Sequence, residues 1–297
     1  MTNLRVKHVA IVGASSQIGQ ALLPLLADAG YASYCIGRED RRAVKNITTY
    51  VFDESHLLFD PPLESVDTVI SLAPLPSIQV VVKMAQLLGA KRIIAFGSTG
   101  KFSKIDSTSA IERDFVLQQD LAEKTFVDQC ETLGIGWTLF RPTMIYGADA
   151  DLNVSFIKSI IRRFRFFPIP IGANGLRQPV HVDDLAIACV LALGCEVTLN
   201  KAYNLGGGEV LSYKTLVSKI FQSEGMRPLL IPIPKSLFLL LIAIAQKFSK
   251  ASFVRKEMVD RMFKDLTLDH HAAKDDFGYA PSPFCLNRKA SNQNPFL

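Results

Sequence analysis

The 297-residue sequence has few cysteines, a single tryptophan and no apolar segment of membrane-spanning length. Its five cysteines are an odd number without a CxxC pair, which argues against a disulfide framework or a zinc site and favours a reducing compartment. The basic N-terminus leads into a short apolar run without a signal-peptide cleavage site. The histidines, including His181 and the pair His270 and His271, lack metal-ligand spacing. We therefore expect a cytoplasmic protein without a metal site.

Two segments raise the question of a macromolecular partner. The apolar core of residues 236–246, SLFLLLIAIAQ, is far shorter than the roughly 20 residues that span a bilayer, so we expect a buried helix and no transmembrane segment. Lysine and arginine also gather between Lys158 and Arg165, among isoleucine and phenylalanine. Such a pattern is ordinarily a solvated helix face, with an anionic ligand, a nucleic acid or a membrane surface as alternatives. We expect no nucleic-acid partner.

The most informative stretch is residues 9–19, VAIVGASSQIG, where an apolar run ends in a glycine-bounded turn and a helical pattern follows. Gly13 permits a sharp exit from a strand, and Gly19 lets the helix pack close to the sheet. Free N–H groups at the start of such a helix can bind a pyrophosphate, although a turn also needs glycine for steric reasons alone. The candidate cofactor contacts in this turn are Gly13, Ser15, Ser16, Gln17, Ile18 and Gly19.

Downstream, strand-like apolar runs alternate with helical patterns. Strands are predicted at residues 31–36, 48–52, 68–73, 92–96 and 136–140, and helices at 77–88 and 115–133. The alternation predicts an α/β fold of the Rossmann type, a doubly wound parallel sheet with a ligand site at the carboxyl ends of its strands. We assign residues 1–150 and 176–205 to the dinucleotide-binding domain, and residues 151–175 and 206–297 to a smaller, mostly C-terminal substrate lobe.

The end of the second predicted strand carries Arg38, with two more arginines close behind. In a dinucleotide-binding fold this position meets the adenosine ribose, where an acidic side chain favours a 2′-hydroxyl and an arginine accommodates a 2′-phosphate. We therefore expect NADP(H) rather than NAD(H), although two acidic residues follow Arg38 directly. Asp53, after the third strand, is a candidate contact to the adenine or a plain turn residue.

Several motifs together resemble the extended short-chain dehydrogenase/reductases of the NAD-dependent epimerase/dehydratase type, over nearly the whole chain. The shared stretches are residues 13–19, 67–73, 96–100, 140–147, 175–184 and 203–206. The middle glycine of the family's turn is absent, and Ser16 and Gln17 fill the turn instead. The resemblance implies a nicotinamide cofactor, with Leu72, Ala73 and Pro142 as further contacts.

The resemblance also implies an orienting serine and a Tyr-x-x-x-Lys pair, whose ammonium lowers the pKa of the tyrosine from the same helical face. Ser98 matches the serine, but the pair falls on Phe115 and Gln119. Phenylalanine has no proton to exchange, and glutamine can only hydrogen-bond a ribose hydroxyl. With its partners missing, Ser98 is equally well explained as a strand-end hydroxyl that bonds local backbone.

Three interpretations of the missing tyrosine stay open. In the first, the protein has lost catalysis and kept cofactor binding. In the second, another acid replaces the tyrosine, either Tyr146 or a residue of the loop after the fifth strand. In the third, the alignment of this sequence with the family's tyrosine and lysine is wrong. The loop candidates are Lys101, Lys104, Asp106, Glu112 and Asp114, and none has a spacing that singles it out.

The substrate-side positions retain more of the family pattern. Arg177 matches an arginine that grips the diphosphate of a nucleotide sugar, with a salt bridge to Asp183 or Asp184 as the alternative. Asn153 and Arg261 match further substrate contacts of the family.

These residues favour an NAD(P)-binding oxidoreductase, or an epimerase/dehydratase-like enzyme, acting on a nucleotide-linked sugar. The alternative is a catalytically degenerate NADP(H)-binding structural or accessory protein, similar to the accessory dinucleotide-binding subunit of respiratory complex I. A weaker third reading is a nucleic-acid or membrane-surface protein that uses residues 158–165. The sequence leaves open whether two chains form a homodimer through their long helices.

Overall fold

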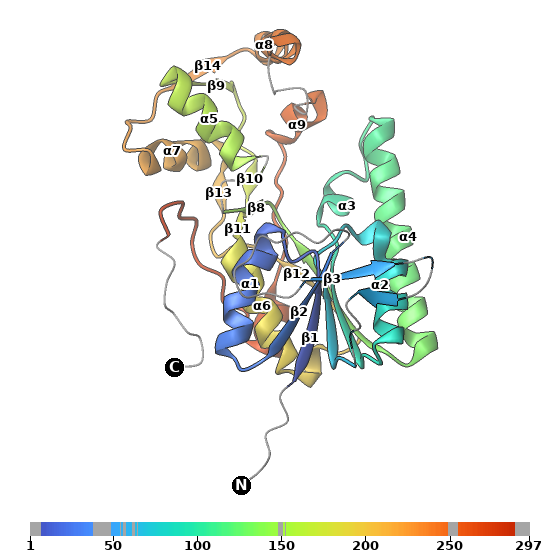
Figure 1. The fold of residues 1–297 in the computed structure, drawn as a ribbon. Helices are drawn as coiled ribbons and strands as arrows, with labels where there is room; N and C mark the ends of the chain where they lie inside the picture. The colour runs from blue at the N-terminus through green and yellow to red at the C-terminus, as the bar shows by residue number, and fades with distance from the viewer. Residues whose placement is uncertain are drawn as a thin grey trace.

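The structure, a computed structural model, describes residues 7–37, 49–53, 55, 58–60, 63, 65–147, 151, 153–248 and 255–288. A central sheet with helices on both faces forms the larger part, and a smaller lobe lies beyond one end of the sheet (Figure 1). The predicted α/β fold is therefore confirmed.

The central sheet has eight strands in the order β12-β7-β6-β5-β1-β2-β3-β4. Their bounds are β1 (His8–Val12), β2 (Ala32–Gly37), β3 (Thr49–Asp53), β4 (Leu58–Asp60), β5 (Thr68–Ser71), β6 (Arg92–Phe96), β7 (Gly136–Pro142) and β12 (Lys201–Leu205). All neighbours pair in parallel except β3 and β4, which are antiparallel. The carboxyl ends of the parallel strands therefore meet along one edge of the sheet.

Helices cover the two faces of the sheet because successive strand residues point to opposite sides. On one face, α1 (Gln17–Asp28) and α6 (Val182–Leu193) pack against side chains such as Ile11. On the other face, α2 (Ile78–Leu87) and α4 (Ala110–Leu133) pack against side chains such as Val69. Shorter helices of the same domain are η1 (Leu75–Ser77), α3 (Gly100–Ser103) and η2 (Glu196–Thr198).

The smaller lobe, here called the substrate lobe, has its own apolar core. Its helices are α5 (Val154–Phe164), α7 (Tyr213–Ser223), α8 (Lys235–Phe248) and α9 (Lys256–Arg261). Its strand pairs are β9 (Phe167–Pro170) with β14 (Leu230–Ile233), and β10 (Leu176–Arg177) with β13 (Leu211–Ser212). The short pair β8 (Ile145–Tyr146) with β11 (Val180–His181) lies where the chain passes between the domain and the lobe (Figure 1).

One sequence expectation about the lobe is wrong, because α8 is not a buried helix. Phe238 is buried in the lobe core. Four other apolar side chains of the helix are exposed, namely Leu237, Leu240, Leu241 and Ile244. Hydropathy alone indicates that a helix is apolar, but it does not say how much of its surface the fold covers.

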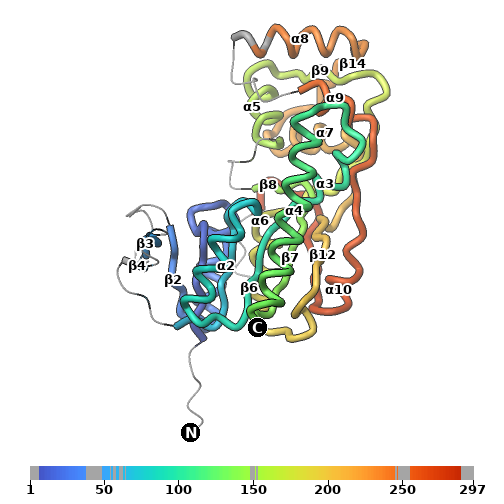
Figure 2. Tube along the Cα trace, turned by 90° about the vertical axis from the view of Figure 1, so that its right-hand side faces the viewer, coloured from blue at the N-terminus to red at the C-terminus, as the bar shows by residue number. Residues whose placement is uncertain are grey.

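The last helix among the described residues, α10 (His271–Phe277), corrects the predicted division into lobes. It packs beside β12, far from the substrate lobe (Figure 2). Ala273, Phe277 and Tyr279 join the apolar core between the sheet and helices α1 and α6. This segment therefore packs with the domain of the central sheet, although the sequence assigned it to the lobe.

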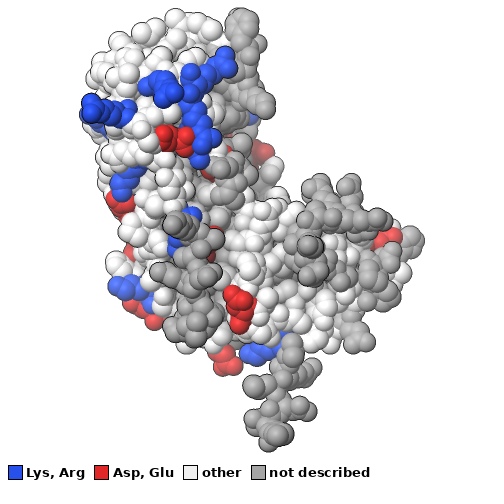
Figure 3. Space-filling view, turned by 60° about the vertical axis from the view of Figure 1, so that its left-hand side comes forward, with Lys and Arg blue, Asp and Glu red and all other residues white. Residues whose placement is uncertain are grey.

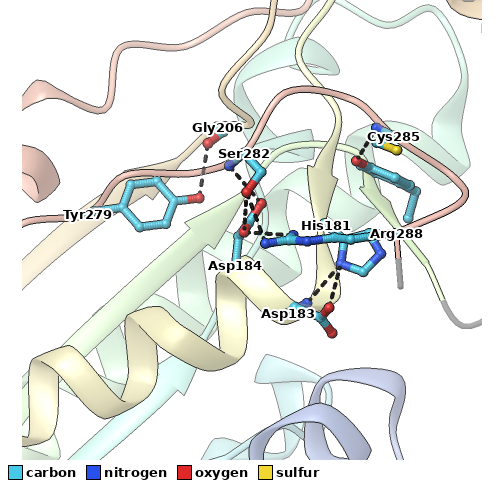
Figure 4. A network of polar contacts seen from close by, with 9 residues as sticks. His181, Asp183, Asp184, Gly206, Tyr279, Ser282, Cys285 and Arg288 are labelled. Carbon is cyan, nitrogen blue, oxygen red and sulfur yellow. Dashed lines mark hydrogen bonds and ion pairs between the residues drawn. The ribbon is translucent and has the colours of Figure 1, made fainter. Parts of the chain in front are cut away.

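A polar network ties the segment after α10 to the start of α6 (Figure 4). The Asp184 carboxylate accepts hydrogen bonds from Ser282 N–H at 3.1 Å and from Arg288 Nη1 at 2.9 Å. Tyr279 Oη donates to the carbonyl of Gly206 at 3.0 Å, and Cys285 N–H donates to a tyrosine hydroxyl on β8. The C-terminal segment thus fastens domain and lobe together.

Candidate functional site

The glycine turn between β1 and α1 forms as the sequence predicts. Gly13 has φ +83°, and a Cβ built there would lie 3.2 Å from the carbonyl carbon of Leu72. A Cβ at Gly19 would lie 2.4 Å from the oxygen of Ala14, so only glycine allows this approach of helix to turn. Ser16 Oγ caps α1 by accepting a hydrogen bond from Gly19 N–H at 3.1 Å. Because this turn directly follows the end of β1, helix α1 begins at the edge of the sheet where the parallel strands end.

The remaining predicted contacts in the turn have different environments. Ser15 is exposed and Ile18 is buried in the core beneath the helix. Gln17 Oε1 is buried and has no hydrogen-bond partner among the described residues. A buried acceptor without a donor is costly, so a bound ligand that supplies a donor would relieve it.

Other predicted cofactor contacts surround the turn or fall outside the described residues. Leu72 and Ala73 follow β5 and border Gly13 directly. Pro142 ends β7, and its carbonyl accepts a hydrogen bond from Thr99 Oγ1 at 2.8 Å. Asp53 is exposed at the end of β3, where its carboxylate accepts from Ser55 N–H at 2.9 Å, as a turn residue does. Arg38 lies outside the described residues.

Helix α4 presents the predicted face to the loop after β6. A Cβ built at Gly100 would lie 3.0 Å from Ser98 Oγ and 3.3 Å from Phe115 Cε1, so the phenylalanine ring stands beside the serine. One turn further along, Gln119 is buried and its Oε1 has no partner among the described residues. Phe115 therefore lies beside Ser98, as the spacing predicts, and Gln119 follows one turn along α4. That they stand at the tyrosine and lysine positions of the family stays a prediction.

The next turn of the same face holds a structural ion cluster. Arg141 donates to both carboxylate oxygens of Glu123 at 2.7–3.1 Å, and Lys101 Nζ lies 2.8 Å from the same carboxylate. Lys101 also contacts Asp120 at 2.6 Å. Its ammonium is therefore engaged with two acidic side chains of α4 and is a poor proton donor to a substrate.

Lys104 is the loop residue that the structure singles out. Its Nζ lies 3.9 Å from the centre of the Phe115 ring, in cation–π contact. Burial, assisted by the nearby Arg261 cation, lowers the pKa of this half-buried amine, and the Glu112 carboxylate only partly opposes the shift. An ammonium with a lowered pKa thus sits over the Phe115 ring. The sequence supplied Lys104 as one candidate among five, because spacing could not show which loop residue reaches the ring.

Glu112 and Arg261 form a buried ion pair between α4 and α9. Arg261 Nη1 donates to both Glu112 oxygens at 2.7 Å, and Ser107 Oγ donates to the same carboxylate at 2.8 Å. Burial opposes ionisation of Glu112, but the hydrogen bonds from Arg261 and Ser107 outweigh it and lower the pKa of the carboxyl. Arg261 therefore reaches the predicted site, held there by a carboxylate of the opposite domain.

Arg177 is placed differently from the expectation of a ligand-gripping arginine. Its side chain is buried, and its guanidinium donates to the backbone carbonyls of Leu176, Lys264 and Arg261 at 2.6–2.9 Å. It also lies over the Tyr213 ring. Burial lowers the pKa of Arg177 to about 10. The alternative prediction, a salt bridge from Arg177 to Asp183 or Asp184, is also wrong. Asp183 pairs with His181, and Asp184 pairs with Arg288.

Asn153 stands at the start of α5 with an exposed side chain that does not cap the helix. Asp151 caps it instead, because its carboxylate accepts the N–H groups of Asn153, Val154 and Ser155. The Asn153 amide is therefore not used to hold the helix end. Among the described residues, no group of three or more His, Cys, Asp or Glu could hold a metal ion.

Comparison with known proteins finds distant sequence relatives. No family model matches the chain. It is 23% identical over 252 residues to the uncharacterized protein y4nG of Sinorhizobium fredii, a match that covers 82% of this chain and 62% of y4nG. It is 27% identical over 99 residues to chloroplast stem-loop binding protein of 41 kDa b of Arabidopsis thaliana, covering 32% of this chain and 25% of that protein. The chain thus spans less than two thirds of either relative.

Solved structures are similar over almost the whole chain. A UDP-glucose 4-epimerase from Thermotoga maritima has a TM-score of 0.64 at 17% identity, covering 92% of this chain and 93% of that one. A nucleoside-diphosphate-sugar epimerase from Pseudomonas aeruginosa has a TM-score of 0.68 at 15% identity, covering 97% and 94%. The chain therefore shares the fold of these epimerases. MoeE5, solved with UDP-glucuronic acid and NAD, shares it at a TM-score of 0.65 and 19% identity, with 93% and 94% covered.

Proposed function

We propose that the protein is an NADP(H)-dependent oxidoreductase or epimerase-like enzyme that acts on a nucleotide-linked sugar. The observation that carries the proposal is the Lys104 ammonium, which stands over the Phe115 ring beside Ser98. It returns an acidic proton to a site from which the tyrosine hydroxyl has been lost. Structural neighbours that hold NAD with a UDP-sugar support a nicotinamide dinucleotide and a nucleotide sugar as the ligands. The choice of NADP(H) over NAD(H) rests on Arg38 alone.

The described residues fit a dinucleotide at the carboxyl edge of the sheet. The Gly13 turn and the start of α1 would receive the pyrophosphate, with Leu72 and Ala73 as the opposite wall. The unpartnered Oε1 atoms of Gln17 and Gln119 are acceptors that hydroxyl groups of the cofactor would satisfy. A nicotinamide bound there supplies or accepts hydride at a sugar carbon.

Within this proposal the chain's own side chains handle the oxygen and its proton. Ser98 Oγ, which accepts a hydrogen bond from Gly100 N–H at 3.0 Å, keeps its hydroxyl proton to hold the substrate oxygen. Lys104 Nζ donates the proton to that oxygen during reduction and accepts it during oxidation. Phe115 excludes water from one side of the ammonium.

The cationic side chains near the site support an anionic substrate. Arg261 uses only Nη1 in its contact with Glu112 within the part of the chain that the structure describes, which leaves Nε and Nη2 for phosphate oxygens. The exposed Asn153 amide is a second contact that we assign to the substrate. Arg177 would not contact the substrate itself. It would position Arg261 by donating a hydrogen bond to the Arg261 backbone carbonyl.

The experiment is a titration of the purified protein with NADPH and NADH, followed by a panel of nucleotide sugars while the absorbance of the reduced nicotinamide is recorded. We expect NADPH binding and turnover with at least one UDP- or other nucleotide-linked sugar. Failure to bind either cofactor would contradict the proposal.

A cofactor-binding protein without turnover is the second candidate, and the phenylalanine in the tyrosine position favours it. NADPH binding without turnover across the panel would be its signature. In that case Phe115→Tyr combined with Gln119→Lys should create reductase activity, because Phe115 already stands beside Ser98 and Gln119 follows one turn along the same helix.

The choice of NADP(H) is tested at Arg38. Arg38→Ala should weaken NADPH binding by about tenfold or more, through loss of a charge-assisted contact to the 2′-phosphate, and leave NADH binding nearly unchanged. The measurement is calorimetric titration with both cofactors. Equal losses for the two cofactors would refute the assignment.

We also infer a homodimer through α4. Leu117 and Leu121 lie one turn apart on this helix and are 68% and 67% exposed, an apolar pair that a second copy of α4 would cover. Leu117→Glu with Leu121→Glu should halve the mass measured by light scattering after gel filtration. A wild-type mass equal to one chain would contradict the inference.

A further inference from the structure

Helix α8 is apolar around its whole circumference, yet the substrate lobe covers only one side of it. Phe238 is 5% exposed in the lobe core, and Leu239 and Ile242 pack against the same core. The opposite side carries Leu237, Leu240, Leu241 and Ile244, which are between 42% and 56% exposed. Their spacing of i, i+3, i+4 and i+7 makes one continuous stripe along the helix. Such a stripe in water indicates a missing partner.

Helix α8, which carries the stripe, lies at the end of the lobe that points away from the central sheet, as both views of the fold show (Figures 1 and 2). Neighbouring elements add exposed apolar side chains to the lobe surface. They are Phe164 at the end of α5, Ile171 after β9, and Leu229 and Ile231 at β14. Helix α8 packs on β9, the partner strand of β14, so this strand pair and the stripe belong to one end of the molecule.

The same lobe is strongly basic. Residues 151–175 and 206–265 contain fourteen Lys and Arg against six Asp and Glu, whereas the rest of the chain contains nineteen against twenty-two. Basic side chains gather on the upper lobe in Figure 3, and Arg163, Arg165, Arg227 and Arg255 are among the exposed ones. The whole positive net charge of the protein therefore comes from the lobe that carries the apolar stripe.

We propose that this end of the substrate lobe docks on an anionic lipid surface, with α8 lying in the plane of the interface. The Leu and Ile stripe would enter the boundary between headgroups and acyl chains, while the surrounding cations meet anionic headgroups. The helix has 14 residues, about 21 Å, and so cannot cross the roughly 30 Å hydrocarbon core. No helix in the described part of the chain is long and apolar enough to do so.

Two other occupants fit the observations less well. A second copy placed by two-fold symmetry would bring two strongly basic lobes together, and like charges across an interface oppose association. A nucleic acid would meet the cations, but aliphatic side chains offer bases no stacking surface, and the α8 stripe contains no aromatic residue. An anionic lipid surface can contact both the basic side chains, through its headgroups, and the apolar stripe, through its acyl chains.

The experiment is flotation of the full chain with two kinds of vesicle, phosphatidylcholine alone and phosphatidylcholine mixed with phosphatidylglycerol. We expect binding to the anionic vesicles that weakens as ionic strength rises from about 0.05 to about 0.5 M. Leu240→Glu with Leu241→Glu should weaken it at least about tenfold, because two side chains no longer leave water and two negative charges are added. The matched control is Leu133→Glu with Val197→Glu, two exposed apolar residues of the other domain, which should bind like wild type.

Several results would overturn the proposal. They are no flotation of the wild type, equal binding to neutral and anionic vesicles, and unchanged flotation of the Leu240→Glu, Leu241→Glu variant. A halved mass of that variant in light scattering would instead assign the stripe to a second copy. Binding of a structured RNA that survives the substitution, without vesicle binding, would assign the cations to nucleic acid. Circular dichroism and NADPH titration confirm that each variant is folded.

Discussion

Lys104→Met is expected to lower turnover by about 10²–10⁴-fold while leaving the dissociation constant of NADPH within about twofold, on the proposal that Lys104 is the proton donor. Methionine retains the length and much of the contact with the Phe115 ring but has no proton to give. Steady-state rates with the best nucleotide sugar, together with a cofactor titration, measure the two quantities separately. Lys124→Met is the control, because Lys124 is exposed on α4 and should be silent.

The pH dependence of turnover gives a second test of Lys104 as the proton donor. The pKa of Lys104 is lowered, first by burial and then by Arg261, so its proton is lost at a lower pH than that of an ordinary lysine. Reduction needs the protonated form, and its rate should therefore fall as pH rises through this lowered pKa. Lys104→Met should remove that limb of the profile, and Lys104→Arg should also lack it because arginine stays protonated. Turnover by Lys104→Met at the wild-type rate would exclude Lys104 as the donor.

Arg177→Met is expected to lower the free energy of unfolding by about 3 kcal/mol. The guanidinium is buried and donates to three backbone carbonyls, at 2.7 Å to Leu176, 2.9 Å to Lys264 and 2.6 Å to Arg261. A thioether would leave these oxygens buried without donors. Denaturant unfolding of the variant, with Arg163→Met as the exposed control, measures the loss.

The same substitution separates the structural and ligand-binding roles of Arg177. If the side chain acts through the protein, stability falls and the KM for a nucleotide sugar rises only because Arg261 is less well placed. If it grips a diphosphate, KM rises strongly while stability stays within about 0.5 kcal/mol of wild type. The second result would contradict the structural role.

The sequence could predict those parts of the fold that depend on local patterns. Strand periodicity located β2, β3, β5, β6 and β7, and the Gly13 turn with its following helix formed where expected. The three-residue strand β4 was too short to show a pattern. The exposure of α8 depends on what the rest of the lobe covers, which hydropathy does not record.

For the candidate site too, the sequence could predict the contacts that depend on local spacing but not those that depend on the assembled fold. Residues spaced four apart on one helix share a face, so spacing placed Phe115 and Gln119 on one side of α4, and the family resemblance placed Phe115 near Ser98, where its ring lies. Lys104 reaches the Phe115 ring through the path of an irregular loop, which has no period. The partners of Arg261 and Arg177 lie 149 and 84 to 87 residues away in the chain, and only the assembled fold brings them together.

Because α10 packs beside β12 of the central sheet, the core of the sheet cannot be completed until α10 has been synthesised. The core that holds β1, which begins at His8, also requires Ala273, Phe277 and Tyr279. A ribosome extends a chain at about 5–20 residues per second, so β1 waits until residues 271–279 have also been made before its core can close. Throughout that interval the apolar faces of α1 and α6 stay partly uncovered. Nascent chains of this protein should therefore be clients of ribosome-associated chaperones until the C-terminal segment leaves the exit tunnel.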